Sequence, residues 1–396
     1  MKFAHCSDIH LGRRPIGPRG DYSNIRFEDY FTVFRNTIEE CLKLNIDAMI
    51  IAGDLFDRKE LIPEVLEKSE ELFSILKDNG IPVITIEGNH DNISFGKEYD
   101  SWILYLEKKG YLSRPYYIRD NEDYLFYPIN IKGYNFYGLG YPGCFVNETI
   151  KALSERLDAE DTADNIVIVH TALSGSEMFP GTVDKETIDL LKNKVTYIAG
   201  GHFHSYSQYP KESPFFFVPG SLEYWDIAES VEGKGFIIFD TDTKTGVFYN
   251  SSPRKKIDIS ITSDHSDFES FKESFIEEID KYSINRNEDI VYVKIKLLKS
   301  FNIDSSQIEN YILSKGALKV AVKIRYPGEA SVLDGKLRIL GTDEVEMELI
   351  SQWEFVGENK EVIFNSLSRL KRYQSQNNET LFFEEMEKLI DNVGGK

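Results

Sequence analysis

Cysteine is scarce in this chain: the 396 residues include only Cys6, Cys41 and Cys144. The number is odd, and no two of these cysteines have the spacing of metal ligands. This pattern argues against a disulfide-stabilised fold and against a zinc knuckle. We expect the three thiols to be buried or inert.

Long apolar runs and basic residues are also scarce. No apolar run approaches the roughly 20 residues that cross a bilayer, and the N-terminal one meets charge too early for a signal peptide. We therefore expect no membrane contact and a cytoplasmic location.

Lys and Arg number 46 against 66 Asp and Glu, a net charge of −20. Because this field repels phosphate, we expect weak nucleic-acid binding without divalent metal or a partner.

The first 250 residues alternate short apolar runs with longer amphipathic ones. Eight of the short runs are predicted strands: Lys2–Cys6, Ala48–Ala52, Val83–Glu87, Phe136–Gly140, Ile166–His170, Thr196–Ala199, Phe215–Val218 and Gly235–Phe239. Predicted helices between them include Phe27–Leu44, Pro63–Lys77 and Tyr99–Lys108. Strand–helix alternation of this kind predicts α/β layers.

Changes in composition divide the chain into a predicted main domain (1–253), a small α/β domain (254–328), a linker (329–341) and a helical segment (342–396). In the small domain, helical and strand patterns alternate twice. The final segment has two apolar stripes at helical spacing, Ile363, Leu367 and Leu370, then Phe382, Met386, Leu389 and Val393. These stripes either pack on the small domain or form a helix pair that docks on a partner.

Five short polar motifs follow predicted strands: Asp8-Ile9-His10, Gly53-Asp54, Gly88-Asn89-His90-Asp91, His170 and Gly201-His202-Phe203-His204. In α/β sheets, ligands bind beyond the carboxyl ends of the strands, so distant segments can converge there. The convergence would gather seven oxygen and nitrogen ligands: Asp8, His10, Asp54, Asn89, His170, His202 and His204. Seven are too many for one tetrahedral zinc ion and suit two metals that share a carboxylate, with Mn²⁺, Fe²⁺ or Zn²⁺ all compatible.

A pair of metal ions at this site could polarise a phosphoryl oxygen and neutralise the negative charge that develops on it. His90, next to a ligand, could reach a leaving oxygen and protonate it, or instead orient a ligand. Gly53, Gly88 and Gly201 would let backbone approach the metals. We expect the remaining histidines, His5 and His265, not to be ligands.

In order and spacing, the five motifs resemble the signature of the calcineurin-like metallophosphoesterases. The resemblance covers residues 1–250 and implies a two-sheet β-sandwich flanked by helices. It also implies that Asp8, His10, Asp54 and His204 bind one metal. Asp54, as the bridge, would join Asn89, His170 and His202 at the other metal, and His90 would be the catalytic histidine.

A narrower resemblance, to the SbcD nucleases and their Mre11 relatives, rests on residues 7–12, 53–57 and 219–223 and on the domain layout. It implies Mn²⁺-dependent cleavage of DNA ends, by exonuclease and endonuclease action, in double-strand-break repair. It implies docking of the C-terminal helices on an SbcC-like ABC-type coiled-coil ATPase. It further implies a homodimer formed through helices of the main domain, here Pro63–Lys77 and Tyr99–Lys108. Asp57 stands where some archaeal relatives carry a histidine linked to exonuclease activity, so the exo/endo balance stays open.

The acidic first helix of the small domain is a poor surface for phosphate, so we predict DNA contacts near the metal-bearing loops. The candidates are Arg13, Arg14, Arg19, Arg58 and Lys59. Two alternatives use the same core: a small-molecule or phosphoprotein phosphoesterase, and a non-catalytic scaffold. The additional domain and amphipathic tail favour the nuclease over the first, and the complete ligand set disfavours the second.

Overall fold

The computed structural model describes residues 1–17, 20–91, 101–120, 123–157, 165–175, 181–327, 363, 366–367, 369–370 and 379–393. The chain divides into two compact units, Met1–Pro327 and Gly328–Lys396. None of the helices in the described ranges is long and apolar enough to cross a membrane.

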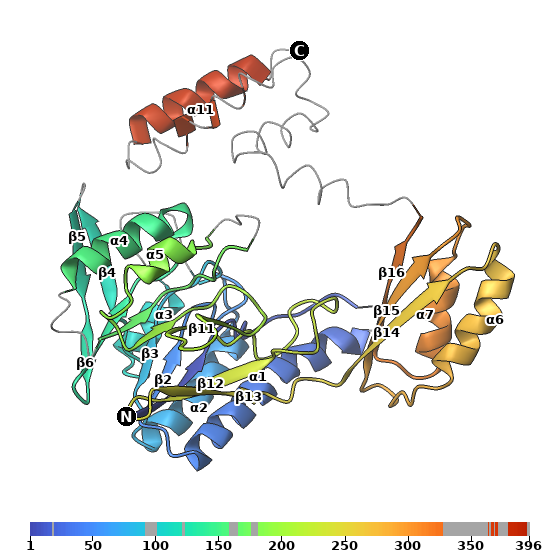
Figure 1. The fold of residues 1–396 in the computed structure, drawn as a ribbon, viewed down its shortest axis with the longest axis horizontal. Helices are drawn as coiled ribbons and strands as arrows, with labels where there is room; N and C mark the ends of the chain where they lie inside the picture. The colour runs from blue at the N-terminus through green and yellow to red at the C-terminus, as the bar shows by residue number, and fades with distance from the viewer. Residues whose placement is uncertain are drawn as a thin grey trace. The chain divides into compact units, whose positions relative to one another are not determined.

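Two β-sheets form the centre of the first unit (Figure 1). The first sheet has the order β13-β12-β1-β2-β3. Its strands are β1 (Lys2–Cys6), β2 (Ala48–Ile51), β3 (Val83–Thr85), β12 (Gly235–Asp240) and β13 (Thr245–Asn250). β1, β2 and β3 run parallel, so the loops that follow them leave from the same edge.

The second sheet has the order β10-β11-β9-β8-β7-β6. Its strands are β6 (Ile129–Ile131), β7 (Tyr134–Gly138), β8 (Asn165–Ile168), β9 (Tyr197–Ala199), β10 (Ser207–Tyr209) and β11 (Phe216–Val218). β7, β8, β9 and β11 run parallel. Each of the eight predicted strands is present in one of these sheets, with its ends within two residues of the prediction.

Apolar side chains fill the space between the two sheets, and helices cover their outer faces. The inner core includes Phe3 and Phe239 from the first sheet and Tyr197 and Phe217 from the second, all buried. Helices α1 (Gly20–Lys43), α2 (Pro63–Asp78) and α3 (Trp102–Lys108) pack on the first sheet. Helices α4 (Val146–Arg156) and α5 (Lys185–Asp189) pack on the second, and the short helix η1 (Gly143–Phe145) precedes α4. The predicted α/β sandwich flanked by helices is therefore confirmed.

Two smaller sheets lie outside this sandwich. β4 (Tyr116–Asp120) and β5 (Asp123–Tyr127) form an antiparallel hairpin. The parallel sheet β14-β15-β16 consists of β14 (Lys256–Ser263), β15 (Ile290–Leu297) and β16 (Lys319–Arg325). Helices α6 (Phe268–Ile279) and α7 (Ser305–Ser314) cover one face of this sheet and enclose its own apolar core. The domain boundary at 253/254 stays a prediction, and contacts through Tyr22, Tyr224, Ile290 and Leu318 join this part to the sandwich.

In the second unit, the structure describes helix α11 (Glu379–Val393) and a few helical residues between 363 and 370. Ser366 donates a hydrogen bond to Glu385 on α11, and Arg369 forms an ion pair with the same carboxylate. The predicted linker, 329–341, lies outside the described residues. The docking role predicted for 342–396 stays a prediction.

Candidate metal centre

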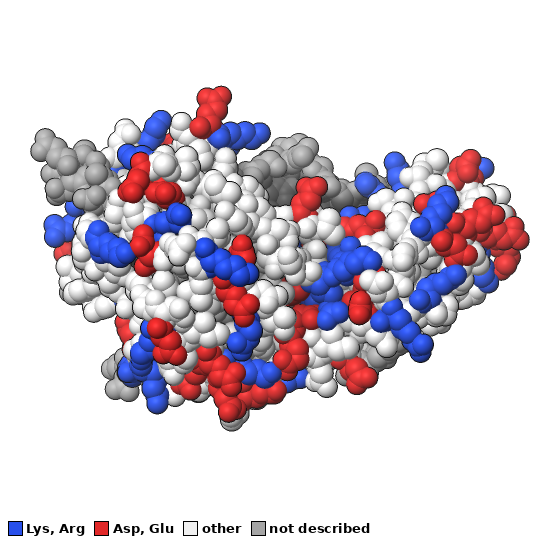
Figure 2. Space-filling view, turned by 90° about the horizontal axis from the view of Figure 1, so that it is seen from below, with Lys and Arg blue, Asp and Glu red and all other residues white. Residues whose placement is uncertain are grey.

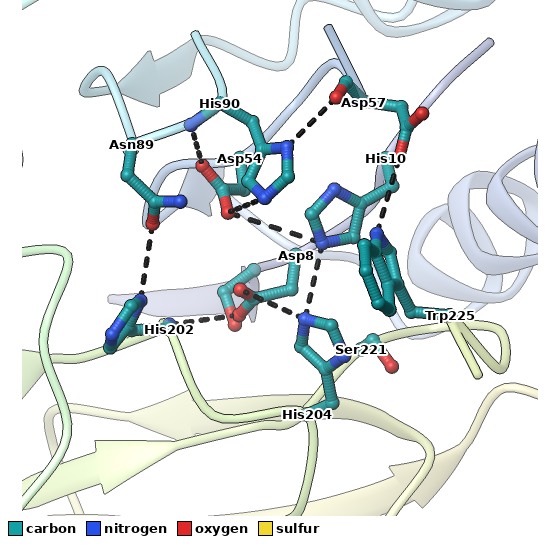
Figure 3. Close-up of polar contacts among 12 residues, drawn as sticks. Asp8, His10, Asp54, Asp57, Asn89, His90, His202, His204, Ser221 and Trp225 are labelled. Atoms are coloured by element: carbon teal, nitrogen blue, oxygen red, sulfur yellow. Dashed lines mark hydrogen bonds and ion pairs between the residues drawn. The ribbon is translucent and has the colours of Figure 1, made fainter. Parts of the chain in front are cut away.

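The five motifs follow β1, β2, β3, β8 and β9, and the side chains drawn in Figure 3 from four of these loops point toward one another. The loops are joined by backbone hydrogen bonds: Asp8 N donates to Gly53 O at 3.1 Å, and His10 N donates to Asp54 O at 3.0 Å. Asp8, His10, Asp54 and His202 all have left-handed φ angles, between 51° and 76°. This conformation is costly for residues with a Cβ and concentrates at functional sites.

Asp54 lies at the centre of the cluster. Its Oδ2 is 3.4 Å from His170 Nε2 and 4.0 Å from Nε2 of both His10 and His90. Its Oδ1 accepts a hydrogen bond of 2.9 Å from the backbone N–H of His90. The carboxylate is buried, so all of these groups meet it away from bulk solvent.

Asp8 and Asn89 connect the remaining predicted ligands. His204 Nε2 lies 3.7 Å from Asp8 Oδ1 and 3.2 Å from His10 Nε2. The backbone N–H of His202 donates to Asp8 Oδ2 at 3.1 Å. Asn89 Oδ1 lies 3.1 Å from both His170 Nε2 and His202 Nδ1. The structure therefore brings all seven predicted ligands into one connected cluster, with His90 beside it.

Three histidines are held by hydrogen bonds that fix which ring nitrogen faces the cluster. His170 Nδ1 donates to Ala52 O at 2.8 Å, and His204 Nδ1 donates to Glu229 Oε1 at 2.6 Å. His90 Nδ1 donates to Asp57 O at 2.8 Å. In each case Nε2 is directed toward the cluster, which is the orientation that outer carbonyls and carboxylates impose on metal-binding histidines.

The charges in the cluster shift its pKa values strongly. Burial alone would lower the pKa of His170, but the adjacent Asp54 carboxylate outweighs it and raises that pKa to about 9. Burial would raise the pKa of Asp54, but His170 and the other imidazoles hold it below its usual value. Burial keeps the pKa of His10 well below its usual value, against the attraction of Asp54.

The donor set fits divalent metal ions. Asp8, His10 and His204 can each place one ligand atom within 4.8 Å of the others, and so can Asp8, Asp54 and His170. Asp8 Oδ1 is buried without a hydrogen-bond partner. A buried carboxylate oxygen in this state is costly unless a cation completes its surroundings. Mixed imidazole and carboxylate donors suit first-row metals such as manganese, iron and zinc.

Glycine is required where the loops touch. A Cβ on Gly88 would lie 2.0 Å from Asp54 Oδ1, and one on Gly53 would lie 2.5 Å from His170 Nδ1. Gly53 also has a φ of +86°. At Gly53 and Gly88, the missing Cβ lets ligand side chains lie directly against the backbone. The approach of backbone to the metals at Gly53, Gly88 and Gly201 stays a prediction.

Three further residues support the site. The buried Asp91 carboxylate accepts hydrogen bonds from the backbone N–H groups of Gly88, Leu55 and Phe56. Its pKa is raised to about 7, mainly by burial and also by the negative charge of Asp54. Glu229 orients His204 and is itself bound by buried Lys234 at 2.6 Å. The Trp225 ring lies within 6.0–6.3 Å of the rings of His10, His90 and His204. Asp91 stands in a recognised motif, but no pattern in the sequence marks Glu229 or Trp225.

The candidate DNA contacts have varied surroundings. Arg13 stacks on the Trp225 ring, 3.7 Å from its centroid, and pairs with Asp57 at 3.0 Å. Arg14 pairs with Glu64 at 3.1 Å. Arg58 is exposed, with Nε 3.5 Å from the Asp57 carboxylate, whereas Lys59 is half-buried. Arg19 lies outside the described residues.

His5 is not part of the cluster, as expected. It is buried between the two sheets, with Nδ1 2.8 Å from the Tyr197 hydroxyl and Nε2 3.0 Å from Gly200 O. Burial lowers its pKa to about 3. This histidine is therefore a neutral residue of the core.

Comparisons with known proteins agree with this geometry. Residues 1–206 match the model of the calcineurin-like phosphoesterase family. The chain is 25% identical over 327 residues to a DNA double-strand break repair protein Mre11 of Methanosarcina mazei. This alignment covers 82% of this chain and 49% of that protein. It is 29% identical over 261 residues to the Mre11 of Methanopyrus kandleri, covering 61% and 54%.

A third relative is an uncharacterized metallophosphoesterase, YhaO, of Bacillus subtilis. It is 28% identical over 244 residues, covering 60% of this chain and 57% of that protein. The chain thus spans about half the length of the curated relatives it matches. Because the family match covers more than half of this chain and includes every predicted metal ligand, the chain belongs to the calcineurin-like phosphoesterase family of phosphoester hydrolases.

Proposed function

We propose that this protein is a metal-dependent DNA nuclease subunit of an SbcCD-like double-strand-break repair complex, with exonuclease and endonuclease action. The observation that carries the proposal is the extent of the similarity. The family match ends at residue 206, whereas the alignment with the Methanosarcina mazei Mre11 protein covers 327 residues. A small-molecule phosphoesterase needs only the first of these regions.

The proposed metal assignment follows the contacts of the cluster. Asp8, His10, Asp54 and His204 would hold one divalent cation, and Asp54, Asn89, His170 and His202 would hold the second. The central position of Asp54 among the imidazoles supports its role as the bridge. Two such cations, which we propose to be Mn²⁺, supply polarisation of the phosphoryl oxygen and neutralise charge that develops on it.

His90 is proposed as the catalytic histidine. Its side chain is 31% exposed, so a substrate can reach it, whereas the His10 and His170 side chains are buried. Because Nδ1 is committed to Asp57 O, Nε2 is the atom that faces the reacting phosphate. From that position His90 can stabilise the charge of the phosphoryl group or donate a proton to the leaving oxygen.

The partners are also proposals. The C-terminal helices would dock on an SbcC-like ABC-type coiled-coil ATPase, and helices α2 and α3 would form a homodimer contact. The substrate would be DNA, and the protein would act in the cytoplasm. Relatives named as Mre11 repair proteins support this assignment.

A comparison of substrates tests the proposed function. The purified full chain would be incubated with Mn²⁺ and end-labelled single-stranded or duplex DNA, and in parallel with small phosphodiesters and phosphomonoesters. Asp54→Asn would serve as the metal-site control. Cleavage of DNA by the wild type alone is expected. Hydrolysis confined to the small esters would move the function to the small-molecule phosphoesterase.

A further inference from the structure

Tyr141 follows β7 at the edge of the second sheet where two of the proposed metal ligands also lie. β7 and β8 run parallel, so the loops that follow them leave the sheet at the same edge. The backbone N–H of His170 donates at 2.8 Å to the oxygen of Gly140, the residue before Tyr141. This hydrogen bond holds Tyr141 next to the loop that carries His170.

The Tyr141 ring packs against the imidazoles of His170 and His202. Its centroid lies 5.9 Å from the centroid of the His170 ring and 5.5 Å from that of the His202 ring. Both histidines are proposed ligands of the second metal ion. The ring of His90 instead lies 4.9 Å from that of His10, a proposed ligand of the first ion. Tyr141 and His90 therefore approach the cluster at different imidazoles.

Gly181 also confines the Tyr141 ring. A Cβ on Gly181 would lie 2.6 Å from Cε2 and 2.7 Å from the hydroxyl oxygen of Tyr141. Gly181 has a φ of +79°, and its carbonyl oxygen accepts a hydrogen bond of 2.6 Å from the Thr171 hydroxyl. Because Thr171 follows His170 directly, the ring is held between two segments that are both bonded to the His170 loop.

The Tyr141 hydroxyl is available to a ligand. Among the residues that the structure describes, no hydrogen bond engages this hydroxyl, and the side chain is only half-buried. Burial, followed by the charge of Asp54, raises the pKa of the Tyr141 phenol, which places the phenol in the electric field of the cluster. A phenol is protonated at neutral pH in any case, so it offers a hydrogen-bond donor without a charge.

Donors close to the metal centre are important because the overall charge of the protein repels phosphate. The net charge is −20, and Figure 2 shows acidic and basic side chains interspersed over the face that it draws. Attraction of a phosphoryl group therefore depends on groups at the metal centre itself. Hydrogen bonds to charged acceptors are stronger than those between neutral groups, so one phenol donor can contribute strongly to phosphate binding.

We propose that Tyr141 is a substrate-binding residue whose phenol O–H donates a hydrogen bond to a phosphoryl oxygen at the metal centre. The inference rests on the proposed metal centre and applies to DNA and to smaller phosphoesters alike. The alternative is that the Tyr141 ring only packs against the ligands His170 and His202. In that case the ring is needed and the hydroxyl is dispensable, so a variant that removes the hydroxyl alone separates the two roles.

Inorganic phosphate, which offers the same oxygen acceptors, is the probe for this test. The full chain would be loaded with Mn²⁺, free Mn²⁺ would be removed, and phosphate binding would be measured by isothermal titration calorimetry. The variant Tyr141→Phe removes the hydroxyl and keeps the ring. The control Tyr134→Phe removes the same group from the first residue of β7, at the opposite end of the strand. Thermal unfolding midpoints and Mn²⁺ content would be measured on the same samples.

Tyr141→Phe is expected to raise the Kd for phosphate about 10- to 100-fold, the range for one hydrogen bond to a charged group. Tyr134→Phe should keep the wild-type Kd, and all three proteins should have the same unfolding midpoint and Mn²⁺ content. An unchanged Kd in Tyr141→Phe would overturn the proposal, and so would a Mn²⁺-loaded wild type that does not bind phosphate. Loss of Mn²⁺ in Tyr141→Phe would also overturn it, because the hydroxyl would then support the metal ligands.

DNA cleavage by the same wild-type sample separates this proposal from the proposed function. End-labelled DNA would be incubated with the Mn²⁺-loaded wild type in parallel with the phosphate titrations. If the DNA stays intact while Tyr141→Phe still weakens phosphate binding, the result counts against the nuclease and supports the role of Tyr141. If the DNA is cleaved while Tyr141→Phe binds phosphate like the wild type, the nuclease stands and the role of Tyr141 is refuted.

Discussion

His170 and Asp54 form a buried ion pair, with Nε2 and Oδ2 3.4 Å apart. His170 Nδ1 faces the Ala52 carbonyl, so both ring nitrogens face oxygen acceptors. The protonated imidazolium carries a hydrogen on each nitrogen and can donate to both acceptors. This explains the rise of the His170 pKa to about 9. Without metal, the proton on His170 provides the positive charge next to Asp54 that a cation would otherwise provide.

Metal binding should therefore release a proton. In the proposed metal site, His170 must be neutral to bind Mn²⁺. The affinity for Mn²⁺ should therefore fall roughly tenfold per pH unit as the pH drops below about 9. Isothermal titration calorimetry in buffers of different ionisation enthalpy, at pH values from 6.5 to 8.5, measures both the affinity and the protons released. Affinity that is constant over this range, with no proton release, would refute the role of the pair.

Glu229→Gln should weaken metal binding without unfolding the protein. The carboxylate of Glu229 fixes the ring of His204 and pairs with buried Lys234, so its loss frees His204 to turn. Substitutions of such outer partners typically reduce metal affinity 10- to 100-fold, and we expect a loss of about that size. Equilibrium dialysis with Mn²⁺ measures it. The control is Glu232→Gln, which replaces an exposed acidic residue nearby. Equal Mn²⁺ affinities of the Glu229→Gln and Glu232→Gln variants would show that His204 needs no support from Glu229.

Gly88→Ala should displace Asp54. The added Cβ would lie 2.0 Å from Asp54 Oδ1 and 2.3 Å from its backbone nitrogen, so the two loops must separate. Because Asp54 contacts three imidazoles, we expect metal content to fall about tenfold or more. Elemental analysis of the purified protein measures this. Gly175→Ala, where a Cβ meets nothing within 4 Å, should keep its metal, and full occupancy in Gly88→Ala would contradict the close packing.

Much of the sandwich could be predicted because its strands are short, buried and apolar. Val83–Thr85 and Tyr197–Ala199 illustrate this: both are fully or almost fully buried, and both precede a polar motif. The strands that were missed have a different pattern. In the hairpin β4–β5, Tyr116 and Tyr127 stack on each other at 4.8 Å while both stay exposed, so burial does not mark these strands.

The cluster could be predicted to the extent that its residues follow strands. The loops after β1, β2 and β3 leave one edge, so Asp8, Asp54 and Asn89 meet there. Glu229 could not be found in this way because it comes from an irregular segment 25 residues after His204.

Replacement of His5 should reduce the sensitivity of the fold to acid. The pKa of His5 is about 3 in the folded protein, against 6.5 unfolded, so the unfolded chain binds one more proton between these values. Stability must therefore fall as the pH drops from 6.5 toward 3. In His5→Gln, the free energy of unfolding should depend less steeply on pH in this window, by about 1.4 kcal/mol per pH unit.

Chemical denaturation at a series of pH values from 4 to 7 measures this difference. His265→Gln is the matched control, because His265 is in a loop of the small α/β part, where its ring forms a hydrogen bond with Ser274. Parallel pH profiles for the wild type and His5→Gln would show that His5 is not held neutral in the core.

The most direct test of the central claim compares the wild type with His90→Ala, both loaded with Mn²⁺. The rate of DNA cleavage under single-turnover conditions and the metal content would be measured on the same samples. In the proposed mechanism, His90 contributes Nε2 to the reacting phosphate but no ligand atom. The account therefore predicts unchanged metal content and a rate lower by about 10²- to 10⁴-fold. An unchanged rate, or a loss of metal in His90→Ala, would contradict it.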